Sequence, residues 1–229
     1  MPARLPVREG RKEIAENRKP PAKRTTDRIR LIAGATALAV ASMIALQQRA
    51  HAEAATPPHV PSAIQVPGGS KPFLAGHAVG TQNYVCLPSA AGFAWTLFTP
   101  QAALFDDGNS PVTTHFFSPN PFENGKVRAT WQHVRDTSTV WGESVVPSSD
   151  PAFVAPGAIP WLRIKVVGRD GPTHGHALTA TTYVQRLNTV GGIAPSTGCA
   201  QSTDVGKQAF VPYTADYYFY SGGGSDAGS

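Results

Sequence analysis

The sequence predicts an all-β domain, an antiparallel sandwich or barrel of about eight strands that carries one disulfide. Between residues 73 and 220, apolar residues come in short runs separated by Gly, Pro, Asn and Asp, a pattern typical of strands and turns. No stretch of eleven or more residues in this range keeps helical spacing without a helix breaker. The gaps between the runs are too short for crossover helices, so antiparallel pairing is expected.

Eight runs have the length and composition of strands. Tight turns separate some of them, because Asp106-Asp107-Gly108-Asn109 and Asn124-Gly125 combine residues that tolerate left-handed backbone. In the seventh run the alternation of apolar and polar side chains is imperfect, so the sequence leaves its inward face unassigned. The expected strands cover residues 79–86, 93–99, 112–117, 126–131, 139–146, 161–167, 179–188 and 213–220.

Residues 1–52 predict a signal peptide. They hold eleven Lys and Arg against four Asp and Glu, a net charge of +7, and residues 31–46 form an uncharged stretch rich in Ala. This stretch has 16 residues, fewer than the roughly 20 apolar residues that span a bilayer. Ala50 and Ala52 supply the small residues expected before a cleavage point after Ala52. The protein is therefore expected to be periplasmic or secreted, with an uncleaved N-terminal anchor as the alternative.

The rest of the chain divides into three parts. Residues 53–72 hold five prolines and no apolar periodicity, and are expected to form an extended linker. Residues 73–220 are the single β domain, and residues 221–229, rich in Gly and Ser, are a flexible tail. Beyond the leader, nine basic side chains face eleven acidic ones. Because the basicity belongs to the leader, no nucleic-acid partner is expected, and membrane contact is expected only through the leader.

Two cysteines, Cys86 and Cys199, lie beyond the leader. An exported chain enters an oxidising compartment, where a disulfide between them is expected. Two cysteines allow one intramolecular pairing. A free nucleophilic thiol is the alternative.

Six blocks of the sequence resemble one family of secreted proteins. They are HAVGTQNYVC (77–86), FAWTLFTPQAALF (93–105), TTHFFSPNP (113–121), PGAIPWL (156–162), TYVQRLNTVGGIAPSTGC (182–199) and VPYTADYYFY (211–220). The blocks follow in order across nearly all of the predicted domain. The family they resemble is the bacterial and fungal one catalogued as domain of unknown function 3455. The resemblance implies an exported, β-rich single domain and implies no activity.

Histidines supply one functional hypothesis. His174 and His176 are two residues apart, and on a strand such positions face one side and can share a metal ion, as in cupin-like sites. His115 is the candidate third ligand. The glutamate that a cupin-like site places a few residues downstream is missing, and the pair falls in a turn-forming run at 171–176. The preferred interpretation is that His174 and His176 are exposed turn residues. The sequence suggests no cofactor other than a divalent metal ion at this site.

Aromatic residues supply a second hypothesis. Exposed aromatic rings bind ligands and anchor protein partners, and export suits a glycan or envelope partner. Core packing is the alternative, because a small β domain needs large core residues. The candidates for a binding surface are Trp131, Trp141, Tyr218 and Tyr220.

Motifs of common enzyme classes are missing from the sequence. The chain has no Gly-x-Ser-x-Gly elbow and no glycine-rich phosphate loop before a helix. Arg186 lies in a strand-like run, where its burial would require a carboxylate such as Asp216. The sequence favours an exported binding or structural protein of the envelope or extracellular space over an enzyme. The alternative is a metal-dependent enzyme of cupin-like type that uses His174, His176 and His115.

Overall fold

The computed structural model describes residues 55–173 and 175–223. The predicted signal peptide and the end of the predicted tail lie outside these residues. In the described part of the chain, no helix is long and apolar enough to cross a membrane.

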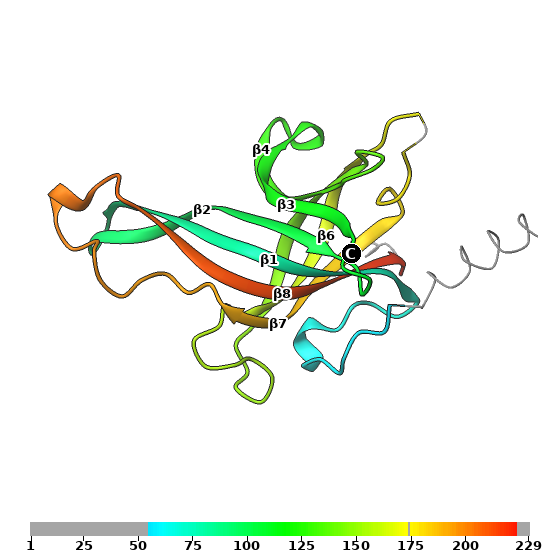
Figure 1. Ribbon diagram of the computed structural model, residues 1–229, viewed down its shortest axis with the longest axis horizontal. Coiled ribbons are helices and arrows are strands. Elements are labelled where there is room, and N and C mark those ends of the chain that lie inside the picture. Colours follow the sequence, from blue (N-terminus) through cyan, green and yellow to red (C-terminus); the bar gives the residue numbers. More distant parts are fainter. Residues whose placement is uncertain (1–54, 174, 224–229) are drawn as a thin grey trace, which may run out of the picture. The chain divides into compact units, whose positions relative to one another are not determined.

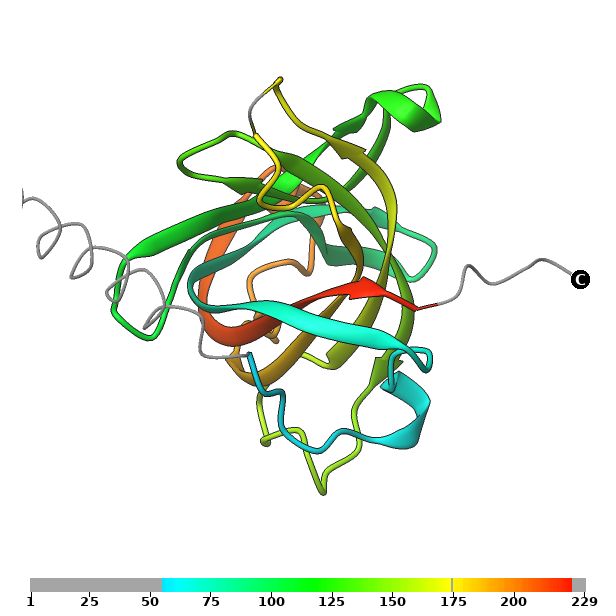
Figure 2. The same ribbon diagram turned by 90° about the vertical axis from the view of Figure 1, so that its right-hand side faces the viewer.

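Eight antiparallel strands form one closed barrel, which confirms the predicted fold class and selects the barrel over the sandwich. Each strand pairs with the next along the chain, and β1 pairs with β8 to close the ring. Figure 2 shows the strands surrounding a common interior. The strands are β1 (Ser70–Ser89), β2 (Gly92–Phe105), β3 (Pro111–Asn120), β4 (Lys126–His133), β5 (Thr139–Ser148), β6 (Trp161–Asp170), β7 (Thr181–Gly191) and β8 (Gln208–Gly222), with short 3-10 helices η1 (Ser62–Ile64), η2 (Pro121–Glu123) and η3 (Ser202–Asp204).

The barrel interior is packed with aromatic and aliphatic side chains. Trp131, Tyr217 and Phe219 are fully buried there, and the Trp131 ring meets the other two edge to face at 5.6 and 6.1 Å between centroids. Between β1 and β2 the wall is tight at Gly80, where an added Cβ would lie 2.1 Å from the carbonyl oxygen of Gln101. The part of the interior around Trp131 is therefore a packed core.

A long arm extends the barrel on one side. In Figure 1, β1, β2 and β8 run beyond the other strands, and the connection from β7 to β8 follows them to their far end. The disulfide between Cys86 and Cys199 joins this connection to β1, which confirms the predicted bridge. The Trp95 Nε1–H also donates to the carbonyl oxygen of Thr197 at 2.8 Å. The arm is thus fastened to the connection by one covalent bond and by hydrogen bonds.

The segment before β1 differs from the expected linker, because it packs on the outside of the barrel. Ile64 in η1 is fully buried in an apolar cluster with residues of β7 and β8. The Gln185 Nε2 donates to the Ile64 carbonyl oxygen at 2.6 Å, and the Arg163 Nη1 donates to the Gln65 carbonyl oxygen at 2.7 Å. The folded unit therefore begins before residue 73. A few isolated apolar residues suffice to dock this segment, and their spacing has no period that a sequence pattern would reveal.

Replacing the docked isoleucine measures how strongly this segment holds the barrel. Ile64→Ala is expected to lower the free energy of unfolding by about 2 to 5 kcal/mol, because it opens a cavity at a fully buried position. Ile193→Ala is the matched control, since Ile193 is 49% exposed and its loss is expected to cost within about 0.5 kcal/mol. Urea denaturation gives both values, and equal effects in the two variants would contradict the docking.

Removing the disulfide tests how far the arm depends on it. The bridge closes a loop across a sequence separation of 113 residues. The double variant Cys86→Ser, Cys199→Ser is expected to lose about 4 to 5 kcal/mol of unfolding free energy through loop entropy. Thermal denaturation of the oxidised protein against the variant checks this loss, and two alkylatable thiols in the native oxidised protein would contradict the bridge.

Candidate functional site

Outward-facing side chains line up in rows across the strands β1 to β6. The positions in each row are register partners on neighbouring strands, and along each strand they alternate with the positions that face into the barrel. The residues of these rows are small or polar, apart from the exposed Val79 and the aromatic Phe116 and Trp141. One row holds Val79, Ala103, Thr114, Gln132, Thr139 and Asp170, and the next holds Phe116, Thr130, Trp141 and Gly168.

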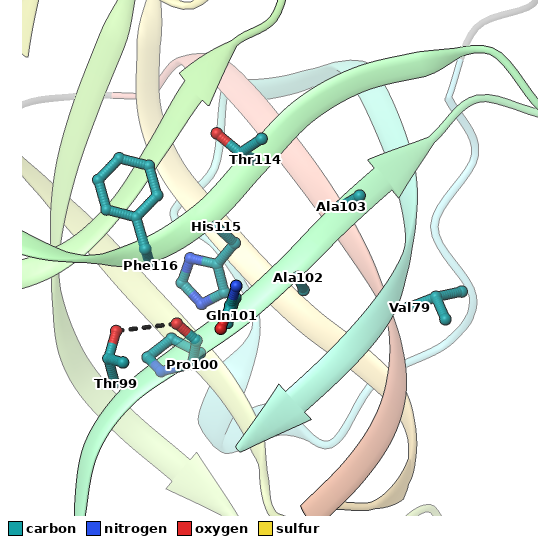
Figure 3. Close-up of a pocket in the computed structure, with 9 residues that line it drawn as sticks. All are labelled: Val79, Thr99, Pro100, Gln101, Ala102, Ala103, Thr114, His115 and Phe116. Carbon is teal, nitrogen blue, oxygen red and sulfur yellow. Dashed lines mark hydrogen bonds between the residues drawn. The ribbon is translucent and has the colours of Figure 1, made fainter. Parts of the chain in front are cut away.

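The first hollow of this outer face lies where β2 and β3 separate. Their pairing ends at Ala102 opposite His115, and further along the Phe117 N–H donates to the Thr99 hydroxyl at 2.9 Å in place of a ladder bond. The hollow has a volume of about 550 Å³. Figure 3 shows its lining, with the His115 ring lying between the two strands beside Gln101. The gap in the ladder thus gives the outer face access to an inward side chain.

His115 is a neutral hydrogen-bond acceptor at this opening. Its Nδ1 lies 2.9 Å from the carbonyl oxygen of Thr130, and because a carbonyl only accepts, the proton sits on Nδ1. Burial lowers the pKa of His115 from 6.5 to about 3. The ring stacks on Trp131 at 4.3 Å between centroids and 7° between planes. Among the described residues nothing pairs with Nε2, whose lone pair is free for a ligand.

The second hollow lies over β3, β4 and β5 and meets the first at Phe116, which lines both. Its volume is about 740 Å³. Hydroxyl and amide groups line it, and they already bond to each other. The Trp141 Nε1–H donates to the Ser118 hydroxyl at 2.9 Å, and the Gln132 Nε2 donates to the Thr139 hydroxyl at 3.2 Å. These bonds hold the groups in place on a rigid sheet.

Charge is nearly absent from the two hollows. Of the described residues that line them, Asp170 is the one with a charged side chain at neutral pH. Arg128, the register partner of Ser118, is paired with Glu123 at 2.6 Å and with Glu143 at 2.8 Å. The hydrogen bond from Arg128 lowers the pKa of Glu123 to about 2, so this group keeps its charge in the pair. The outer face therefore offers neutral donors and acceptors beside aromatic rings.

The four aromatic residues predicted as a binding surface do not form one. Trp131 is fully buried inside the barrel, because it occupies an inward position of β4. Tyr218 and Tyr220 are 8% and 3% exposed under the segment before β1. Trp141 is 7% exposed and alone of the four lines a hollow. The docked N-terminal segment, which the sequence did not suggest, covers the face that would have displayed the two tyrosines.

The structure describes two of the three histidines predicted as metal ligands. His174 lies outside the described residues, His176 is exposed in the connection from β6 to β7, and His115 is in the barrel wall. Within residues 55–173 and 175–223, no three His, Cys, Asp or Glu side chains are grouped as a metal site.

The predicted pairing of Arg186 with Asp216 is wrong. Arg186 points into the barrel and its Nε and Nη2 donate to the Pro160 carbonyl oxygen at 3.2 and 2.8 Å. Asp216 points outward, where it lies 2.6 Å from the His77 Nδ1 and accepts from Asn188 at 2.7 Å. Opposite faces of the sheet separate the two residues.

Fold and site together define an eight-stranded antiparallel barrel with a neutral, hollowed outer face. The chain belongs to the family described as protein of unknown function (DUF3455), whose model matches residues 67–221. This match confirms the resemblance seen in the sequence. Searches of curated proteins and of solved structures find no match.

The low pKa of His115 makes the stability of the protein sensitive to acid. In the unfolded chain the imidazole takes up a proton below about pH 6.5, whereas in the folded protein it stays neutral down to about pH 3. The unfolded state then binds more protons, so the free energy of unfolding is expected to fall by about 1.4 kcal/mol per pH unit between about pH 6 and 4.5. His115→Phe, which keeps a ring against Trp131, is expected to lose this slope in urea denaturation. An unchanged slope in the variant would contradict the neutral, buried imidazole.

Proposed function

We propose that the protein is an exported binding protein that holds a neutral glycan in the two joined hollows of its outer face. The observation that carries the proposal is the lining, in which neutral hydroxyl, amide and imidazole groups surround Phe116 and Trp141. The disulfide supports export to the periplasm or the outside of the cell, because such bonds persist in oxidising compartments.

The chemistry of a sugar matches the groups on this face. Sugar hydroxyls both donate and accept, and so do the side chains of Thr114 and Gln132, which reach solvent on the outer rows. His115 adds an acceptor, since its Nε2 lone pair faces no partner in the described residues. A charged ligand would find one carboxylate, Asp170, and no cation in the lining. Neutral hydrogen-bonding ligands are therefore favoured.

Aromatic rings beside these groups provide apolar surface for the C–H faces of sugar rings. Phe116 borders both hollows, and Phe122, which is 59% exposed, meets Trp141 edge to face at 6.0 Å. Volumes of 550 and 740 Å³ lie within the usual range of ligand sites. The proposal is for binding and includes no reaction step. With a pKa of about 3, His115 is a neutral imidazole at neutral pH, so it is not a general acid there and is a weak base.

Oligosaccharide binding tests this proposal. A glycan array selects neutral oligosaccharides, and intrinsic tryptophan fluorescence then measures their dissociation constants. The double variant Thr114→Ala, Gln132→Ala is expected to bind roughly tenfold or more weakly, because two hydrogen bonds of about 1 kcal/mol each are lost.

The matched control is Gln208→Ala, at an exposed position of β8 whose register partner, Val85, lines neither hollow. This variant is expected to bind like the unchanged protein. An array without a single neutral glycan among its hits would contradict the proposal, and so would equal losses in the double variant and the control.

A further inference from the structure

Arg186 is a cation inside the barrel. On β7 it shares its face with Val184, which belongs to the interior core, while the neighbouring Leu187 belongs to the outer cluster. The guanidinium is part-buried and donates through Nε and Nη2 to the Pro160 carbonyl oxygen. A carbonyl carries no net charge. The hydrogen bonds therefore orient the guanidinium and leave its positive charge uncompensated.

No carboxylate neutralises Arg186 in the described residues. Six acidic side chains there pair instead with His77, Arg128, His133 and Lys207. An unpaired charge in a barrel wall is costly, and such charges normally find a counter-ion.

Hydrogen-bond donors without acceptors surround the guanidinium. The hydroxyls of Tyr213 and Tyr217 lie 3.3 Å apart, and since one of them donates to the other, one O–H is left over. The Trp131 Nε1 is fully buried and has no partner in the described residues, and the buried Gln82 Nε2 has no hydrogen bond of good geometry. The Gln82 amide acts on the hydroxyl of Tyr213 and the Arg186 guanidinium on that of Tyr217, and in each case the interaction opposes the rise in the pKa of the tyrosine. Trp131 also touches Tyr217, so these donors belong to one cluster. The cluster has a surplus of N–H and O–H groups and needs an acceptor.

The electrostatic effect of Arg186 reaches across this cluster. Burial raises the pKa of Tyr213 and of Tyr217, and the positive charge of Arg186 opposes the rise in both. The same charge adds to the burial that keeps His115 neutral. Arg186 is thus the cation whose positive charge acts on His115, Tyr213 and Tyr217.

We propose that Arg186, Tyr213 and Tyr217 form an internal anion site that binds the carboxylate of a small organic acid. One guanidinium balances one negative charge, which matches a carboxylate. A phosphate dianion would leave an excess negative charge among apolar side chains. The hydroxyls of the two tyrosines and the amide of Gln82 supply the neutral donors that a carboxylate accepts. This site is on the inner side of the wall and does not depend on glycan binding outside.

Acetate and benzoate are suitable probes, with acetamide and benzamide as neutral counterparts of the same shape. Isothermal titration at neutral pH is expected to show saturable binding of at least one carboxylate and roughly tenfold or weaker binding of its amide, as lost charge-assisted hydrogen bonds imply. Arg186→Gln is expected to weaken carboxylate binding roughly tenfold or more. Arg169→Gln, at an exposed position of β6, is the matched control and is expected to change nothing.

Tyr217→Phe keeps the buried ring and removes one hydrogen-bond donor. This variant tests the site if Arg186→Gln fails to fold. It is expected to weaken carboxylate binding roughly fivefold. Equal binding of acid and amide, tighter binding of inorganic phosphate than of benzoate, or absence of any carboxylate binding would overturn the proposal. None of these results bears on the oligosaccharide titrations of the Thr114 and Gln132 variant, so the two proposals succeed or fail separately.

Discussion

The pairing of β1 with β8 is the constraint on which the rest of the structure depends. It runs from Ser70 opposite Gly222 to Val85 opposite Gln208 and joins the two ends of the folded chain. Because it closes the sheet, every described strand is paired on both sides and the inward side chains are removed from water. Because burial disfavours charged forms, the His115 imidazole in the wall is neutral, and the Arg186 guanidinium without a carboxylate partner is unusual.

Closure also gives the wall two chemically different sides. The inner side is apolar with a cluster of donors around Arg186, whereas the outer side of β2 to β5 carries neutral hydroxyl and amide groups. The two sides meet at His115, because the ladder between β2 and β3 ends there and exposes an inward ring to an outer hollow. This arrangement supports the proposed binding role. The groups are held rigidly by the sheet, and the one titratable ring in the hollows has its pKa far from neutrality.

Local pattern predicted the eight strands, since alternation and turn residues lie within or beside each run. The disulfide was predicted from two cysteines that follow an export leader. Closure was not predictable, because it is a pairing between segments more than a hundred residues apart and a sandwich would show the same runs. The docking of Ile64 over Tyr218 and Tyr220 could not be predicted, because the apolar residues of this proline-rich segment have no helical or strand periodicity that would indicate burial. The two rows of outward-facing residues were not predicted. Their continuation across strands depends on register, which only the structure supplies.

The central claim is that closure of the barrel keeps His115 neutral, with its proton on Nδ1 and its Nε2 available at the opening. Nitrogen-15 NMR of the labelled imidazole rings tests this directly, because the shifts of Nδ1 and Nε2 distinguish the two neutral tautomers from the imidazolium ion. At about pH 5 the account predicts one ring with a protonated Nδ1 and an unprotonated Nε2, which is lost on substitution of His115. A His115 ring that titrates near its usual pKa of 6.5, or that carries its proton on Nε2, would contradict the account.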